Sequence, residues 1–265
     1  MDLLRSRTSL RRLKLGDLFH LLFNLGLAAL VYLLVAVWQL YTLAFILVMI
    51  SKWRIFAVQP RFWFANIVAN LVDIIVGLSV LVFIYQASSA AWLQVVWAVL
   101  YAIWLTVVKP QSGIRGVTFQ AAVGQFVGLT ALFWYASSIP DTLVVGGAWL
   151  VSYAAARQLI SAYEEDLVDL LSAIWALFVA QLTWFFNRWV DVFAFPPSSN
   201  GQPSHAYFII PQAAVVMIVV GFGAAHFYDA AKNNKLGSRR TNYTFGFTAI
   251  LLLLVLVVSK WNSLT

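Results

Sequence analysis

The sequence predicts an all-α fold, a polytopic integral membrane bundle of about nine transmembrane helices. Two features of its composition indicate this class: 62% of the 265 residues are hydrophobic and only 10% are charged, against roughly 25% charged in a soluble domain. A third is the recurrence of uncharged apolar runs that are long enough to cross a membrane. A β-barrel is excluded because barrel strands alternate apolar and polar residues, whereas 250–258 is apolar throughout.

The first 16 residues are predicted to form a basic cytoplasmic segment, followed by a single transmembrane helical domain over 17–262. The segment contains five positive residues, Arg5, Arg7, Arg11, Arg12 and Lys14. Because cytoplasmic segments are enriched in Lys and Arg, the N-terminus is expected in the cytoplasm. The apolar run that follows is too long for the core of a cleavable signal peptide, so no cleavage is expected.

The apolar run from about 15 to 51 has two interpretations. As one helix it would be longer than the membrane core is thick. It therefore forms either two short helices, 18–35 and 37–51, or an interfacial helix followed by one crossing. The loop after it is basic again, with Lys52, Arg54 and Arg61. Two cytoplasmic ends require an even number of crossings between them, which favours the pair and nine spans over the alternative of eight.

The remaining spans follow in order, separated by loops of alternating charge. They are predicted at 64–85, 91–108, 117–136, 142–161, 167–186, 207–228 and 243–260. Loops containing Lys109 and Lys232 are expected on the cytoplasmic side. The loop 187–206 is rich in Pro and Ser and is predicted to be non-cytoplasmic. The charge pattern favours a bacterial cytoplasmic (inner) membrane.

Asp73 is the polar residue whose placement inside a predicted span costs the most free energy. Asn66, Asn70 and Asp73 are spaced i, i+4 and i+7, so they share one helical face. A lone carboxylate near mid-membrane costs about 2.5–3.5 kcal/mol unless it is protonated, hydrated or paired. The pattern predicts either an ion or proton path lined by the two amides or a bond from Asp73 to Ser, Thr, Asn or Arg of a neighbouring helix that locks the bundle.

Arg157 is a further candidate for the transport path, because it lies just inside the cytoplasmic end of its span. It could extend to lipid phosphate, pair with an acid, or hold an anionic substrate. Gln120 and Gln125, in the span 117–136, are interpreted as residues that form hydrogen bonds between helices. The same span contains Gly124-x-x-x-Gly128, a pattern that allows two helices to approach closely in lipid.

Acidic residues are concentrated in the predicted cytoplasmic loop before the span 167–186. The end of the span 207–228 brings a histidine and another acid to a comparable depth. With no cysteine in the chain, such a set would favour Mg²⁺, Mn²⁺ or Zn²⁺. The alternative is that Asp166 caps the following helix and its neighbours complement the helix dipole. The six candidate ligands of this divalent cation are Glu164, Glu165, Asp166, Asp169, His226 and Asp229.

The predicted span 207–228 contains Pro211, Gln212, Gly221 and Gly223, which predict a kinked or broken helix. Broken helices in membranes usually line a cavity. No nucleotide-binding loop, dinucleotide fingerprint or hydrolase motif is present.

Three functions are compatible with these patterns. The first is a small-solute or ion transporter or channel, and a water-filled path past Asp73 would favour it. The second is a non-catalytic subunit or scaffold of a membrane complex, favoured by a sealed bundle with an exposed groove. The third is a membrane-embedded lipid-modifying enzyme.

The expected partners are the lipid bilayer and another membrane protein or a second copy of the chain. Nucleic acid is not expected, because the net charge of +7 is distributed over short loops.

Overall fold

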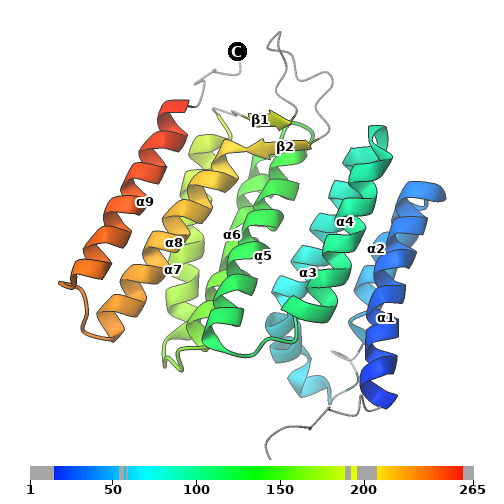
Figure 1. Ribbon diagram of the computed structural model, residues 1–265, viewed down its shortest axis with the longest axis horizontal. Coiled ribbons are helices and arrows are strands. Elements are labelled where there is room, and N and C mark those ends of the chain that lie inside the picture. The colour runs from blue at the N-terminus through cyan, green and yellow to red at the C-terminus, as the bar shows by residue number, and fades with distance from the viewer. Residues whose placement is uncertain (1–14, 54–56, 58, 189–191, 196–207, 259–265) are drawn as a thin grey trace, which may run out of the picture.

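Nine α-helices run up and down in one bundle (Figure 1). The computed structural model describes residues 15–53, 57, 59–188, 192–195 and 208–258, and the helix count refers to these. Eight of the helical segments are long and apolar enough to cross a membrane, which confirms the predicted all-α membrane bundle. The helices are α1 (Leu15–Tyr32), α2 (Tyr41–Ile50), α3 (Trp63–Gln86), α4 (Ala91–Ile103), α5 (Ile114–Trp134), α6 (Asp141–Ser161), α7 (Val168–Phe186), α8 (Gln212–Lys232) and α9 (Arg239–Val258).

The long first apolar run folds into two helices, as the paired interpretation predicted. α1 continues into a π-helical turn, η1 (Leu33–Val37), and the chain reverses through Trp38 and Gln39. Gln39 adopts φ 56°, a left-handed conformation that costs a non-glycine residue about 1–2 kcal/mol. α2 has only ten residues and is therefore about 15 Å long, half the thickness of a membrane core. The second helix is thus shorter than predicted and is not of spanning length, so the described chain has eight helices of spanning length, the alternative count, and not the preferred nine.

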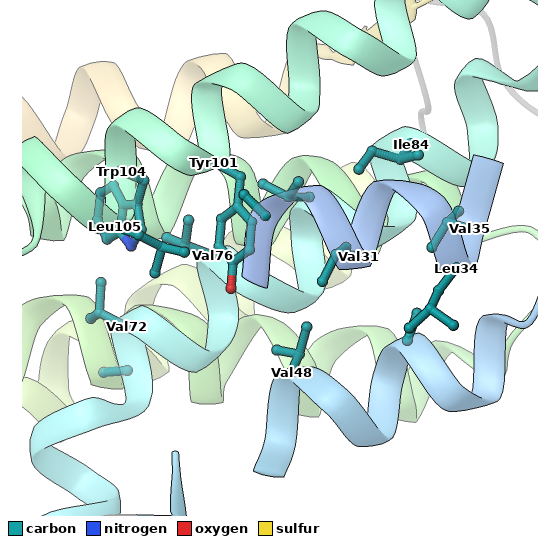
Figure 2. Packing of buried hydrophobic residues seen from close by; sticks show 14 residues of the cluster. Val31, Leu34, Val35, Val48, Val72, Val76, Ile84, Tyr101, Trp104 and Leu105 are labelled. Carbon is teal, nitrogen blue, oxygen red and sulfur yellow. The ribbon is translucent and has the colours of Figure 1, made fainter. Parts of the chain in front are cut away.

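The two larger hydrophobic cores lie mostly in different parts of the bundle, which are called the N-terminal half, α1–α4, and the C-terminal half, α5–α9. The first core contains Val31, Val48 and Val76 (Figure 2), and the second contains Leu129 and Met217. α3 is the central helix of this arrangement, since it packs against α4 on one side and against α5 and α6 on the other.

Glycines make the seam between the halves, as the G-x-x-x-G pattern predicted. A Cβ atom at Gly124 would lie 2.5 Å from Cγ1 of Val72 on α3, and one at Gly128 would lie 2.6 Å from Cγ2 of Ile75. Both distances are shorter than any real Cβ contact. The seam therefore requires glycine at both positions, because it brings the α5 backbone directly against the α3 side chains.

The two ends of the bundle differ in chemistry. At one end, the hairpin end, β1 (Val192–Phe195) pairs antiparallel with β2 (Phe208–Pro211) (Figure 1). The opposite end carries Lys109 and Lys232 and is called the basic end. Residues 1–14 and most of the predicted loop 187–206 lie outside the described residues, so the structure says nothing of the N-terminal segment.

The predicted span 207–228 was wrong at its start. Residues 208–211 form β2, and α8 begins only at Gln212, with Pro211 as its N-cap at φ −64° and ψ 131°. Proline is tolerated at the start of a helix because the first N–H groups have no intrahelical partner. Pro211 therefore marks the beginning of α8 and does not kink it.

Candidate functional site

A buried carboxylate shared by two lysines is the main charged feature of the bundle. Asp73 of α3 has a side chain only 9% exposed, and its Oδ2 atom pairs with the ammonium groups of Lys52 and Lys109. The Lys109 Nζ atom lies 2.5 Å from this oxygen. The other oxygen, Oδ1, accepts a hydrogen bond of 3.0 Å from the indole Nε1 of Trp104. These four residues, Lys52, Asp73, Trp104 and Lys109, are called the Asp73 cluster.

A π-helical turn places two members of the cluster side by side. α4 continues into η5 (Trp104–Val108), and the N–H of Lys109 donates to the carbonyl of Trp104 at 2.8 Å. Because a π turn bonds residues five apart, Trp104 and Lys109 stack on one side of the helix end and both reach α3. Figure 2 shows the ring of Trp104 entering the packed space beside Val72 and Val76.

Lys52, the remaining cationic member of the cluster, lies inside the bundle because α2 is short. The helix ends at Ile50, and the Ser51 hydroxyl donates to the carbonyl of Val48 at 2.6 Å. Lys52 follows directly and is only 6% exposed. A helix of full spanning length would have carried this ammonium group farther from α3, so the truncated α2 is what makes the ion pair.

Gln120 of α5 holds the helix end that carries Lys109. Its Nε2 atom donates to the carbonyls of Val108 at 2.7 Å, Lys109 at 3.3 Å and Gln111 at 2.9 Å. Its Oε1 atom accepts a bond of 2.6 Å from Gln158 of α6. The predicted role of Gln120 as a hydrogen-bonding residue between helices is confirmed. This amide fixes the position of the cluster relative to the C-terminal half.

The charges of the Asp73 cluster do not balance. Two ammonium groups face one carboxylate, so the cluster carries one excess positive charge when all three groups are ionised. Taking an ion out of water costs several kcal/mol, and one carboxylate cannot fully compensate two cations. Lys52 is sealed at 6% exposure, whereas Lys109 is 40% exposed. Lys109 is therefore the member that can exchange partners with the surroundings.

The asparagines predicted to line a path with Asp73 are not among its hydrogen-bond partners in the described chain. The Nδ2 atom of Asn70 donates to the carbonyl of Asn66 at 2.8 Å, within the same helix. Arg157 lies in the C-terminal half, where its Nε atom is 2.7 Å from Oδ1 of Asp169. Of the four predicted path residues, the structure thus brings only Asp73 into the charged cluster, and its partners are lysines and a tryptophan.

The predicted metal ligands are distributed among separate partners at the basic end. Asp169 also accepts a bond of 3.0 Å from the Tyr153 hydroxyl, and Asp229 accepts one of 3.3 Å from the Tyr163 hydroxyl. The ring of His226 lies against Phe222. Within the described ranges, no group of three or more His, Asp or Glu residues is arranged to hold a metal ion.

The loop between α6 and α7 is tied to the end of α8 by a salt bridge. Lys232 Nζ lies 2.6 Å from Oε1 of Glu165 and also donates to the carbonyl of Tyr163. The hydrogen bond from Lys232 holds the pKa of the Glu165 carboxyl below its usual value. Burial, and then the charge of Asp229, raise the pKa of the Tyr163 hydroxyl.

The predicted capping role of Asp166 is wrong. α7 starts at Val168, with Leu167 as N-cap and no capping bond from a side chain. Glu164, at φ 55°, and Asp166 are both exposed on the loop. The helix therefore begins one residue later than the capping interpretation required.

An aromatic cluster joins the two halves at the hairpin end. The ring of Phe208 on β2 lies 5.9 Å from that of Phe83, 5.0 Å from Trp97 and 5.3 Å from Trp134. These three rings come from α3, α4 and α5. Trp134 also donates its Nε1–H to the carbonyl of Ile209 at 2.6 Å, which fastens the hairpin to the bundle.

The C-terminal half contains buried polar atoms that have no hydrogen-bond partner among the described residues. They are the Nε2 atom of Gln125, the hydroxyls of Thr130 and Ser152, and both amide atoms of Gln212. Gln125 lies close to α8, because a Cβ atom at Gly221 would be 3.8 Å from its Oε1 atom. Buried polar groups in proteins are nearly always satisfied, often by water, so this interior is suited to water or polar solute.

The fold and the site together define a polytopic helical membrane protein with a buried, charge-imbalanced cluster. Comparisons of the chain with protein-family models, with curated proteins and with solved structures found no match.

Proposed function

We propose that this protein is a small-solute or ion transporter in which the Asp73 cluster is the charged element of the path. The observation that carries the proposal is the sharing of one buried carboxylate oxygen by two ammonium groups. Ionisable groups inside membrane bundles are costly, and they commonly mark ion pathways and proton relays. An ion pair that only stabilised the bundle would need one cation for Asp73. The presence of a second lysine therefore favours a functional role.

The cluster has the chemistry of a two-state switch. In one state Asp73 holds both lysines, as in this structure. In the other, protonation of Asp73 or arrival of an ion releases Lys109, the more exposed lysine, while Lys52 stays sealed beneath it. Such an exchange changes the contacts between α2, α3 and η5, and a ligand that prefers one state shifts the population of both.

Interrupted helices near the cluster support a transport path. α2 ends at about half the membrane thickness, and η5 replaces the last α-helical turn of α4. In membrane proteins, irregular backbone is tolerated where it is buried in protein or lines a water-filled cavity. The unpartnered polar atoms of Gln125, Thr130 and Ser152 add a polar interior to the other half. We propose that the basic end is cytoplasmic, as the charge rule favours, and that the membrane is a bacterial inner membrane.

A second candidate function is a scaffold subunit, because the bundle offers apolar surfaces to a partner. A groove of about 220 Å³ between α1 and α4 is lined only by apolar or aromatic side chains, including Ala28, Ala29, Ala98 and Ala102. α9 packs on α8 alone among the stronger helix contacts, and few of its residues are buried. Small residues in such a groove allow a helix of another membrane protein, or of a second copy, to approach closely.

The transport proposal is tested by flux through purified protein in sealed liposomes. Currents are recorded after rapid jumps of proton, sodium, potassium, chloride, acetate and phosphate concentration, with empty liposomes as the blank. At least one jump should give a saturable current that falls about tenfold or more in Asp73→Asn, because the neutral amide removes the charge that the switch needs. Asp169→Asn, which alters an exposed ion pair, should keep the current. Wild-type liposomes that behave as empty ones in every jump contradict the proposal.

A further inference from the structure

From the Asp73 cluster we infer that the protein binds a small oxyanion, a carboxylate or phosphate group, at Lys109. This inference rests on the proposed function and names its substrate class. Its first support is the charge imbalance: with all three groups ionised, two ammonium groups and one carboxylate leave one positive charge uncompensated. In the described part of the chain, the ion pairs of Lys52 and Lys109 involve Asp73 and no other acid.

Four other acids of the described chain have partners elsewhere, while Glu164 and Asp166 are exposed on the loop before α7. Asp169 pairs with Arg157, Glu165 with Lys232, and Asp141 with Arg188. Asp229 accepts from Tyr163. The described ion pairs thus give the Asp73 cluster no second counter-charge, and an anion from outside the bundle is the natural source of one.

The second support is the set of donors that is already arranged around a carboxylate. Lys52 and Lys109 reach one oxygen of Asp73, and the indole of Trp104 reaches the other. The Asp73 side chain is therefore an internal copy of the ligand we infer. A carboxylate or phosphate that displaces it meets the same two ammonium groups and the same N–H, and such charge-assisted bonds are among the strongest in proteins.

The third support is that the ammonium group of Lys109 has more N–H donors than its ion pair with Asp73 requires. An ammonium group has three N–H donors, and Asp73 is its only ionic partner in the described chain. The carbonyls at the end of η5, which a lysine could otherwise approach, accept from the Gln120 amide instead. The Lys109 side chain is also 40% exposed, so an anion could approach it from the basic end.

An unpartnered hydroxyl lies close to the cluster. Tyr101 is fully buried, and its Oη atom has no hydrogen-bond partner in the described chain. A Cβ atom at Gly77, one helical turn beyond Asp73, would be 3.0 Å from this oxygen. Figure 2 shows Tyr101 and Trp104 entering the packed space from the same helix. Tyr101 thus places an unused hydroxyl donor one helical turn from Asp73.

The oxyanion has two possible sources, a free anion in solution or the headgroup of an anionic lipid. Binding to the purified full-length chain in a neutral detergent is measured by calorimetry with sodium acetate and inorganic phosphate. A second arm uses nanodiscs of phosphatidylcholine with and without phosphatidylglycerol and follows the thermal unfolding temperature. Saturable binding of either soluble anion supports the inference with a free ligand, and stabilisation by phosphatidylglycerol alone supports it with a lipid.

Three variants separate this inference from a structural role. Lys109→Gln should weaken binding about tenfold or more, whereas Lys232→Gln, which alters a lysine paired elsewhere, should leave it unchanged. Asp73→Asn should bind the anion more tightly than wild type, because the internal competitor is gone while the donors remain. Should Asp73→Asn unfold, stabilisation of wild type but not of Lys109→Gln by the anion decides the question. Equal binding in wild type and Lys109→Gln, or no binding by wild type in either arm, overturns the inference.

The result is distinguishable from a failure of the proposed function. Binding that Lys109→Gln abolishes, with no flux in liposomes, keeps the oxyanion site and contradicts transport. Flux of protons or metal cations, with no oxyanion binding, keeps transport and overturns the oxyanion site.

Discussion

Each half of the bundle contains an ion-paired aspartate, but one aspartate is buried and the other is exposed. In the N-terminal half, Asp73 and Lys52 are sealed, and a second cation is attached to the same oxygen. In the C-terminal half, Asp169 is 72% exposed and meets Arg157 alone as a cation. Exposed pairs contribute about 0–1 kcal/mol because water and salt screen them, whereas removing one partner of a buried pair costs about 3–5 kcal/mol. Burial, and not the number of charged residues, thus distinguishes the candidate site.

The largest effect is expected for removal of the shared carboxylate. Asp73→Ala leaves two lysines without a counter-charge and should lower the free energy of unfolding by about 3–5 kcal/mol. Reversible unfolding in mixed detergent micelles provides the measurement. Asp169→Ala is the matched control in the other half, with an expected loss of at most about 1 kcal/mol. Equal losses for the two variants would remove the contrast between the halves.

The seam between the halves should be the next most sensitive feature. Gly128→Ala places a methyl group 2.6 Å from Ile75 Cγ2 and 2.8 Å from Val151 Cγ1, and overpacking of this kind costs about 1–3 kcal/mol. Gly146→Ala is the control, because nothing lies within 4 Å of its Cβ position, and alanine is the better helix former. The same unfolding assay should show a loss for the first variant and no loss for the second. A stable Gly128→Ala protein would mean that the halves do not meet as closely as described.

An effect of comparable size is expected for the amide that joins the cluster to the C-terminal half. Gln120→Leu leaves the carbonyls of Val108 and Gln111 and the Gln158 amide without their partner, at a cost of about 1–3 kcal/mol. Gln125→Leu is its control, since the Nε2 atom of Gln125 has no partner in the described chain to lose. The anion binding measured for the Asp73 cluster should weaken only in Gln120→Leu, because this change also loosens the position of Lys109. Weakening of equal size in both variants would speak against a specific role of Gln120.

The smallest effect concerns the exposed salt bridge at the end of α8. The pKa of Glu165 is lowered in the folded state by its bond from Lys232, so its contribution to stability is present above the ordinary carboxyl value of 4.5. That contribution is lost as the pH falls through the lowered folded-state pKa. The unfolding temperature of wild type should therefore slightly exceed that of Glu165→Gln at pH 7, and the two should converge in acid. A difference that grows on acidification would contradict the assignment.

Several parts of this architecture follow from local sequence signals. The membrane class follows from composition, and the reversal near Gln39 follows from an apolar run too long for one crossing. The close approach at Gly124 and Gly128 follows from their spacing. Asp73 stands out because a carboxylate inside an apolar span needs a partner. Each of these inferences depends on a property of one helix, or of one pair of adjacent helices.

The partners of Asp73 could not be found in this way. Lys52 and Lys109 appear in the sequence as loop residues that mark the cytoplasmic side. They reach α3 only because α2 stops after ten residues and because η5 turns with a π geometry. Neither property has a pattern in the sequence. The proposed metal cluster illustrates the converse, since Glu165 and Asp169 are neighbours in the sequence but bind different cations from different helices.

The most direct test of the account is a pair of double-mutant cycles, one in each half of the bundle. The buried cycle combines Asp73→Asn with Lys109→Gln, and the exposed cycle combines Asp169→Asn with Arg157→Gln, with the free energy of unfolding as the readout. We expect a coupling energy of about 1–3 kcal/mol between Asp73 and Lys109 and at most about 1 kcal/mol between Asp169 and Arg157. A coupling between Asp73 and Lys109 no larger than that of the exposed pair would contradict the central claim that Lys109 is electrostatically bound to a buried carboxylate.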